Sequence, residues 1–170
     1  MSRFVVGVDL GTTNCSLAYA AMDEGTADSR SSPRSVPIEQ LPIPQVVGLN
    51  DVSPRPLLPS FLYLAGPKEF PPKALDPPWK STPDRAVGVF ARDHGAKVPG
   101  RLVSSAKSWL SHAGVDRRAA ILPWTAAADV DKISPVDAST AYLSHLRDAW
   151  NASAAGKTAA DRLEIGRAHV

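Results

Sequence analysis

The chain has 170 residues, of which 44% are hydrophobic and 21% charged, and its formal net charge is +2. This length is enough for a sizeable core, and so small a charge gives no strong attraction to nucleic acid or to an anionic membrane. A single cysteine, Cys15, excludes an intrachain disulfide and indicates a reducing compartment. No apolar run approaches the roughly 18 residues of a membrane span, and the N-terminal run is too short for a signal peptide. We therefore expect a cytoplasmic protein.

The first predicted element is a β-hairpin. Apolar residues 4–8 lead to Asp9, residues 11–14 read Gly-Thr-Thr-Asn, and a second apolar run covers residues 15–21, with Cys15 expected on its core side. The tip carries a carboxylate, two hydroxyls, an amide and a glycine, which suit a hard metal ion and phosphate oxygens. An ordinary turn is the alternative, of about equal weight. Asp9 counts against the ordinary turn, because this acidic residue follows a buried-looking strand and has no basic residue beside it.

The next part of the chain is rich in proline. Residues 22–34 are predicted to form a loop, and 13 of the 16 prolines lie between Pro33 and Pro83. Such density excludes helix from most of the segment and leaves two short strands, at residues 45–49 and 60–65. Residues 66–83 are predicted to be an exposed loop. Residues 86–94 form either a strand that turns into a helix or a short helix.

Two helices are predicted in the second half. Apolar residues recur at helical spacing over residues 101–113, before Gly114. Ser134 is a good N-cap, Pro135 suits the first helical position, and an apolar face predicts a helix over residues 134–151. His145 lies near this face and is expected to be structural, since no second metal ligand stands at helical spacing. Residues 151–158 look like a Walker A loop but follow a helix instead of a strand, so we dismiss them.

The string Val-Gly-Val-Asp-Leu-Gly-Thr-Thr-Asn at residues 6–14 resembles the first phosphate motif of the heat shock protein 70 (DnaK-type) chaperones. These belong to the superfamily of actin, hexokinase and the sugar kinases. Three further segments resemble the family in the same order: Leu-Pro-Ser-Phe at residues 58–61, Val87-Gly88 with Ala91, and Ser-Ala-Lys-Ser-Trp-Leu at residues 105–110. The helix at residues 134–151 resembles the family's Ile-Ser-Pro helix. Ser108 replaces a basic residue of the pattern and Ser111 a glycine, so we expect a divergent, bacterial-type member.

The resemblance implies an α/β fold, namely a partial actin-like ATPase (ribonuclease H-like) lobe with an incomplete mixed sheet and flanking helices. It implies ATP and Mg²⁺ as cofactors. Asp9 would hold the metal ion, Gly11, Thr12, Thr13 and Asn14 would contact the phosphates, and Lys107 would be the catalytic residue that reaches the γ-phosphate and orients the attacking water. Positioning and charge neutralisation supply most of the acceleration in phosphoryl transfer, which agrees with these roles.

The implied function is that of a molecular chaperone, in which ATP hydrolysis is coupled to the binding and release of unfolded client protein during protein folding and the stress response. Clients and co-chaperones would bind to regions beyond this chain, and neither nucleic acid nor a membrane is expected as a partner. A small-molecule (sugar) kinase of the same superfamily and an actin-like filament protein are the alternatives. The segment around Lys107 argues against the kinase, and Thr12-Thr13-Asn14 against the filament protein.

The resemblance also divides the chain. Residues 1–39 would start the first lobe with the phosphate-binding hairpin, residues 40–115 would form a Pro-rich inserted subdomain that ends in the lysine helix, and residues 116–164 would return to the lobe. Family members continue into a second phosphate loop and a second lobe. Residues 165–170, Ile-Gly-Arg-Ala-His-Val, match the in-frame translation of a common sequencing adapter. We therefore expect an N-terminal fragment with an artefactual tail, which binds ATP weakly or not at all and is itself inactive.

Overall fold

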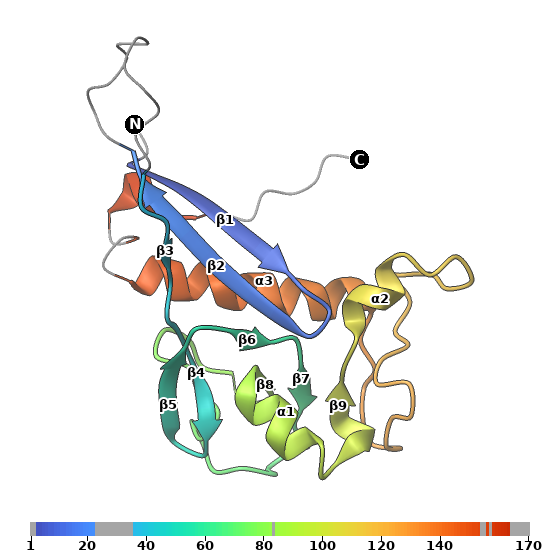
Figure 1. Cartoon of the computed structure of the whole chain (residues 1–170). Coiled ribbons are helices and arrows are strands. Elements are labelled where there is room, and N and C mark those ends of the chain that lie inside the picture. The colour runs from blue at the N-terminus through green and yellow to red at the C-terminus, as the bar shows by residue number, and fades with distance from the viewer. Residues whose placement is uncertain (1–2, 23–35, 83, 154–155, 157, 164–170) are drawn as a thin grey trace.

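The computed structural model describes residues 3–22, 36–82, 84–153, 156 and 158–163, and these form a mixed α/β fold (Figure 1). The strands form three small sheets. The first sheet contains β1 (Phe4–Leu10), β2 (Asn14–Ala21), β3 (Glu39–Gln40) and β6 (Leu58–Pro59). The second contains β4 (Ile43–Gly48) and β5 (Asp51–Arg55), and the third β8 (Arg85–Val87), β7 (Leu62–Leu64) and β9 (Leu102–Val103). The helices are α1 (Val89–Gly95), α2 (Ala106–Leu110) and α3 (Pro135–Ala152), with 3₁₀ turns η1 (Pro99–Arg101) and η3 (Ala159–Asp161).

The predicted hairpin is confirmed. β1 and β2 pair antiparallel from Phe4 opposite Ala21 to Leu10 opposite Cys15. Cys15 and Leu17, two residues apart on β2, both face the core and are completely buried, as the period of two along a strand requires. β2 continues the sheet on its other side through β3 and β6, with Asn14 opposite Pro59. The short β6 therefore lies directly beside the start of β2, next to the hairpin tip.

Helix α3 is confirmed, and its start follows from local chemistry. The Ser134 hydroxyl accepts a hydrogen bond from the Asp137 backbone N–H at 3.0 Å, and the Asp137 carboxylate accepts one from the Ser134 N–H at 3.4 Å. This capping box satisfies two N–H groups that the first turn of a helix leaves without partners. The apolar face of α3 then packs under the first sheet, where Trp150 meets the ring of Tyr19 edge to face at 5.1 Å between centroids.

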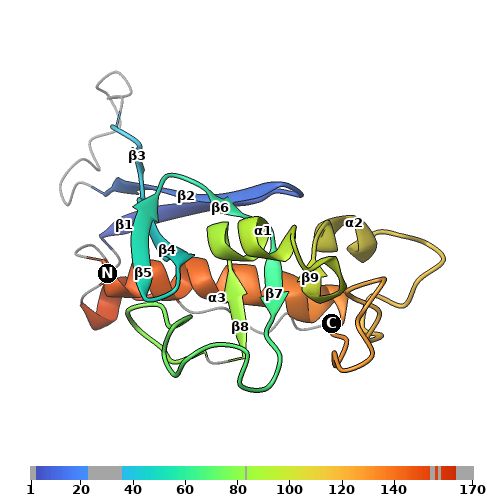
Figure 2. The same ribbon diagram turned by 90° about the horizontal axis from the view of Figure 1, so that it is seen from below.

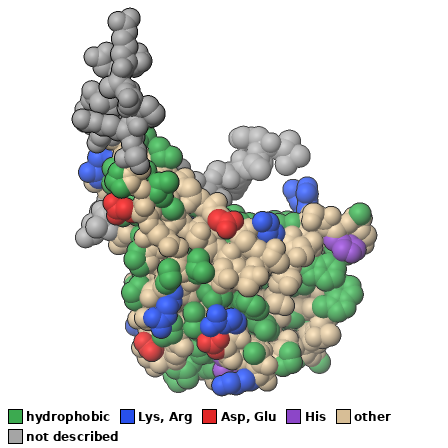
Figure 3. Space-filling view, viewed as in Figure 1, with side chains coloured by type: hydrophobic (Ala, Val, Ile, Leu, Met, Phe, Trp, Pro, Cys, Tyr) green, Lys and Arg blue, Asp and Glu red, His purple; other side chains and the backbone are tan. Residues whose placement is uncertain are grey.

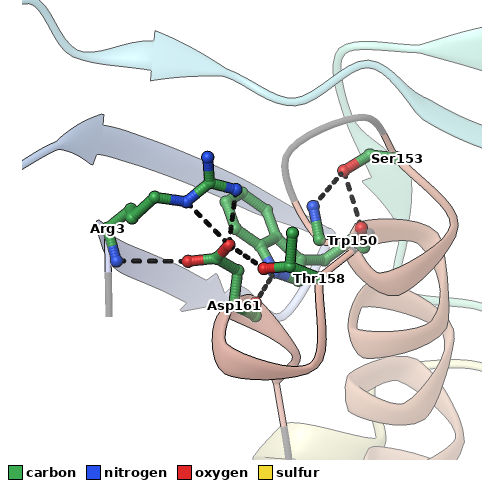
Figure 4. Close-up of polar contacts among 6 residues, drawn as sticks. Arg3, Trp150, Ser153, Thr158 and Asp161 are labelled. Atoms are coloured by element: carbon green, nitrogen blue, oxygen red, sulfur yellow. Dashed lines mark hydrogen bonds and ion pairs between the residues drawn. The ribbon is translucent and has the colours of Figure 1, made fainter. Parts of the chain in front are cut away.

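The N-terminus of β1 is tied to the end of the described chain (Figure 4). The Asp161 carboxylate accepts hydrogen bonds from the Arg3 backbone N–H at 3.1 Å and from Nε and Nη2 of Arg3 at 2.9 and 2.6 Å. It also accepts one from the Thr158 hydroxyl, and the Asp161 carbonyl accepts one from Trp150 Nε1 at 2.7 Å. These bonds, with the Arg3 guanidinium first among them, lower the pKa of Asp161 to about 2. The tie holds η3 against α3 and β1.

The predicted helix over residues 101–113 is too long at both ends, since α2 covers only Ala106–Leu110 and ends before the expected stop at Gly114. Leu102 and Val103 form β9, in which Val103 lies opposite Leu62 of β7, and α2 begins only at Ala106. Ser105 between them has a φ of 54°, which interrupts any continuous helix. Pairing with a distant strand has thus overridden the helical spacing of the apolar residues, because burial of Val103 is satisfied equally well in a sheet.

Other sequence predictions are confirmed or adjusted. Within residues 66–82 the structure has turns and neither helix nor strand, but the segment is not exposed throughout, since Ala74 and Leu75 are buried. Residues 86–94 form the strand-to-helix alternative, as β8 and α1. The strand expected at residues 45–49 begins earlier, at Ile43, and the one expected at residues 60–65 is shorter, with β7 covering only Leu62–Leu64. A mixed sheet was expected, whereas every strand pair among the described residues is antiparallel. Most of the predicted loop at residues 22–34 and all of residues 165–170 lie outside the described chain.

No helix in the described ranges is both long and apolar enough to cross a membrane.

Candidate nucleotide-phosphate site

The hairpin tip presents its polar residues to solvent. Asp9, Thr12 and Thr13 are exposed, while Gly11 and Asn14 are half-buried. The expectation that Asp9 follows a buried strand is wrong, because β1 is the last strand in the order of its sheet and Val5, Gly7 and Asp9 share its exposed face. The carboxylate therefore needs no buried partner to be stable, and it is accessible to a hydrated cation.

Gly11 allows the tip to close tightly. A Cβ atom built at this position would lie 2.1 Å from the Asn14 carbonyl oxygen, far inside any tolerated contact. Any side chain would force the turn open and shift Asn14 with it. The glycine of the motif is thus required by the shape of the turn itself, whether or not the turn binds a ligand.

Ser60 holds the tip from outside the hairpin, and the sequence did not single it out. Its hydroxyl donates to the Gly11 carbonyl at 2.8 Å, and its backbone N–H donates to the Thr13 carbonyl at 2.9 Å. Its Oγ also lies 3.2 Å from the buried Cys15 Sγ. The one sequence signal was a serine within the Leu-Pro-Ser-Phe string, where the residues on either side are mostly apolar.

The contacts of Ser60 determine which backbone groups of the tip are left for a ligand. The carbonyls of Gly11 and Thr13 are occupied by Ser60. In the described part of the chain, no hydrogen bond uses the backbone N–H of Thr12 or of Thr13. The carbonyls of this turn are bound by Ser60, while its N–H groups and two exposed hydroxyls are left to donate hydrogen bonds. Such a turn suits an anion with several acceptor oxygens.

Lys107 lies beside this tip. It is exposed on the first turn of α2, next to Ala106, which is buried in the same apolar cluster as Cys15. The hairpin tip and α2 are side by side in both ribbon views (Figures 1 and 2). Acidic and basic side chains appear on the surface over these two elements in Figure 3. A carboxylate and an ammonium group are therefore available on the same edge of the molecule.

The Cys15 thiol reports on both charges. Burial raises the pKa of Cys15, and hydrogen bonds involving Ser60 and Gly11 oppose this rise. Of the two weaker charge effects, the Asp9 carboxylate raises the pKa and the Lys107 ammonium group lowers it. The thiol itself is buried and its pKa is raised, so it is not a nucleophile.

The residues fit a magnesium ion that a nucleotide brings with it. Within the described ranges no group of three or more His, Cys, Asp or Glu side chains could hold a metal ion. Mg²⁺, however, usually keeps several waters and binds through one or two carboxylates together with phosphate oxygens. A single exposed carboxylate at Asp9, beside unoccupied N–H groups, matches this type of site and not a protein-only metal cage.

Two further sequence candidates have structural roles. His145 Nε2 lies 2.9 Å from the Pro44 carbonyl oxygen, which agrees with the expected structural role of this histidine. Asn151, the first residue of the dismissed Walker-like string, lies in α3, and its side chain donates to and accepts from the Leu163 backbone at 3.1 and 2.9 Å.

Comparison of the chain with protein-family models, curated proteins and solved structures finds no match in any of the three.

Proposed function

We propose that the chain is the N-terminal part of a DnaK-type chaperone ATPase with an actin-like lobe, and that its hairpin tip binds the phosphates of magnesium ATP. The observation that carries this proposal is the meeting of three separate segments around Cys15. The tip contributes Asp9 and its N–H groups, and Ser60 comes from the Leu-Pro-Ser-Phe segment. Helix α2, whose Ala106 lies in the same buried cluster as Cys15, brings Lys107. All three are among the segments that resemble the family in sequence.

Each residue has a role that follows from its position. Asp9 would hold the hydrated magnesium ion, and the N–H groups and hydroxyls of Thr12 and Thr13 would donate to phosphate oxygens. Lys107 would place a positive charge near the terminal phosphate and orient the water that attacks it. The nucleotide supplies the phosphoryl group whose transfer to water releases energy for work on a client protein. In the cytoplasm the whole protein would couple this step to unfolded clients and co-chaperones.

A titration of the 170-residue chain followed by two-dimensional amide NMR tests the phosphate site. Because one half of a two-lobed site binds weakly, we expect dissociation constants on the order of millimolar. Mg-ATP should shift the amides of Gly11 to Asn14 and of Lys107, and AMP, which lacks the β- and γ-phosphates, should not. If Mg-ATP at about ten times that concentration leaves the tip amides in place, or if AMP shifts them equally, the proposal is refuted.

Two variants sharpen the test. Asp9→Asn should reduce the difference between titrations with and without magnesium, because the carboxylate that holds the ion is gone. Asp131→Asn is a matched control, since Asp131 is exposed and lies outside the tip and α2. An unaltered magnesium dependence in Asp9→Asn would contradict the metal assignment. For the alternatives, phosphorylation of an added sugar or filament assembly with ATP would favour a kinase or an actin-like protein.

A further inference from the structure

A cavity of about 560 Å³ lies on α3, away from the hairpin tip. It is open to solvent on one side and is lined by one face of α3, by β8, and by the proline-rich segment that precedes β8. The ribbon seen from below shows this segment passing close to α3 (Figure 2). The volume is within the range of small-molecule sites, roughly 300–1,000 Å³. From its lining we infer that this cavity binds a small aromatic amine, a role independent of the proposed phosphate site.

The cavity has an apolar floor and an aromatic wall. Val46 and Leu75 are buried at its base. Trp79 forms a wall and meets the His145 ring edge to face, at 5.2 Å between centroids and 77° between planes. A flat apolar ring placed here would gain contact with both aromatic side chains and leave water.

His145 supplies a hydrogen-bond acceptor. A carbonyl oxygen can only accept, so the 2.9 Å contact with the Pro44 carbonyl requires the proton of the neutral ring to be on Nε2. Burial lowers the pKa of His145, so the ring is neutral at pH 7. Nδ1 then carries a lone pair, and it is not among the buried side-chain atoms that lack a partner in the described chain. His145 lines the cavity, and no hydrogen bond among the described residues uses this lone pair.

The remaining polar groups on the α3 side are also acceptors or hydroxyls. Asp137, Thr140, Ser144 and Asp148 follow one another along the face of α3 that lines the cavity. Asp137 caps the helix and Asp148 accepts from Arg147 at 2.7 Å, but a carboxylate can accept more bonds than either arrangement uses. This face therefore favours a ligand that donates hydrogen bonds, and an ammonium group donates three.

The charge of the lining agrees with a cation. The carboxylates are Asp84, Asp137 and Asp148, and the cations are Lys80 and Arg85, so three negative charges stand against two positive ones. Asp84 is paired with Arg85 and Asp148 with Arg147, each at 2.6 Å, which leaves Asp137 and Lys80. An anionic ring compound would find carboxylate acceptors along this face of α3 where it needs hydrogen-bond donors, and an aliphatic amine would lose the contact with the Trp79 and His145 rings.

Three probes separate these contributions in NMR titrations of the full chain. Tryptamine carries an indole ring and an ammonium group, indole-3-propionate the same ring and a carboxylate, and propylamine an ammonium group without a ring. Tryptamine should shift the amides of residues 140–148 and the Trp79 side-chain N–H, with a dissociation constant on the order of 1 mM. Indole-3-propionate should bind about fivefold more weakly than tryptamine, and propylamine should cause no saturable shift.

Variants show whether the shifts arise in the cavity. Ser144→Leu and, independently, Thr140→Leu fill it from α3 and should weaken tryptamine binding at least tenfold. Ala152→Leu places the same side chain at an exposed position of α3 that does not line the cavity, and should leave binding unchanged. The inference is overturned if tryptamine causes no saturable shift, if the anionic probe binds equally well, or if both filling variants fold and still bind normally.

Discussion

Replacing Ser60 by alanine tests whether the hairpin tip depends on a residue 49 positions away from Gly11. The change removes the 2.8 Å bond to the Gly11 carbonyl and the 3.2 Å contact with Cys15 Sγ, but keeps the backbone bond to Thr13. Ser60 is only 2% exposed, so no water replaces its hydroxyl directly. A polar group left without its partner costs about 1–3 kcal/mol when buried. Because Gly11 is half-buried and water reaches it in part, we expect a loss of about 1–2 kcal/mol.

Urea unfolding measures this loss. With a slope of about 2 kcal/mol per molar urea, typical of a small domain, the midpoint should fall by roughly 0.5–1 M. The Thr12 and Thr13 amide signals should move, because the Gly11 carbonyl that anchors their turn is released. Ser139→Ala is the matched control: Ser139 is also buried, and its hydroxyl donates at 2.8 Å to the Pro135 carbonyl within α3. That change should alter stability by less than about 0.5 kcal/mol, since a helical serine gains little from such a bond.

The reasoning is refuted if Ser60→Ala and Ser139→Ala have the same midpoint and the Thr12 and Thr13 amides stay in place. A double-mutant cycle with Cys15→Ala separates the two contacts of the hydroxyl. We expect weak coupling between Ser60 and Cys15, because a thiol is a poor hydrogen-bonding partner, so most of the effect should come from Gly11.

Three further predictions follow from single contacts. Lys107→Ala should change the free energy of unfolding by less than about 0.5 kcal/mol, because the side chain is exposed. In the proposed full-length ATPase it should lower ATP turnover strongly and leave nucleotide binding nearly intact, which a turnover assay and a binding titration check. The pKa of Asp161, about 2 in the fold, lies below its unfolded value of roughly 4, so its stabilising effect should be present above pH 4 and lost as the pH falls toward 2. Unfolding of Asp161→Asn at pH 7, 4 and 2 should accordingly vary less with pH than that of the unaltered chain. Tyr142→Phe should leave thermal stability unchanged or raise it by up to about 1 kcal/mol, because the buried Tyr142 hydroxyl has no hydrogen-bond partner among the described residues; a clear loss would contradict this.

The elements that could be predicted from sequence are those set by neighbouring residues. The start of α3 follows from Ser134, Pro135 and Asp137, which act on each other within one turn. The hairpin follows from alternation and a short polar tip. The start of α2 could not be predicted, because Val103 is placed by Leu62 of β7, and the spacing of apolar residues alone is compatible with either a helix or a strand.

The candidate site divides in the same way. Asp9 to Asn14 could be identified because their chemistry is concentrated in one turn, and Lys107 because its segment resembles a known family. Ser60 could not be identified, since it acts by donating hydrogen bonds to two backbone carbonyls of a distant segment. The exposure of Asp9 was also missed, because a strand's sequence does not show whether it lies at the edge of its sheet.

The segment from β6 to β7 connects the two halves of the site. Pro59 pairs with Asn14, Ser60 binds the carbonyls of the tip, and two residues later Leu62 pairs with Val103. Val103 ends β9 just before α2, so the same short segment that shapes the tip also determines where Lys107 stands. Thr12, Thr13 and Lys107 are therefore positioned by one segment that contains none of them. The proposed phosphate site depends on residues 58–62 as well as on the motif itself, because displacing these residues would separate the lysine from the turn.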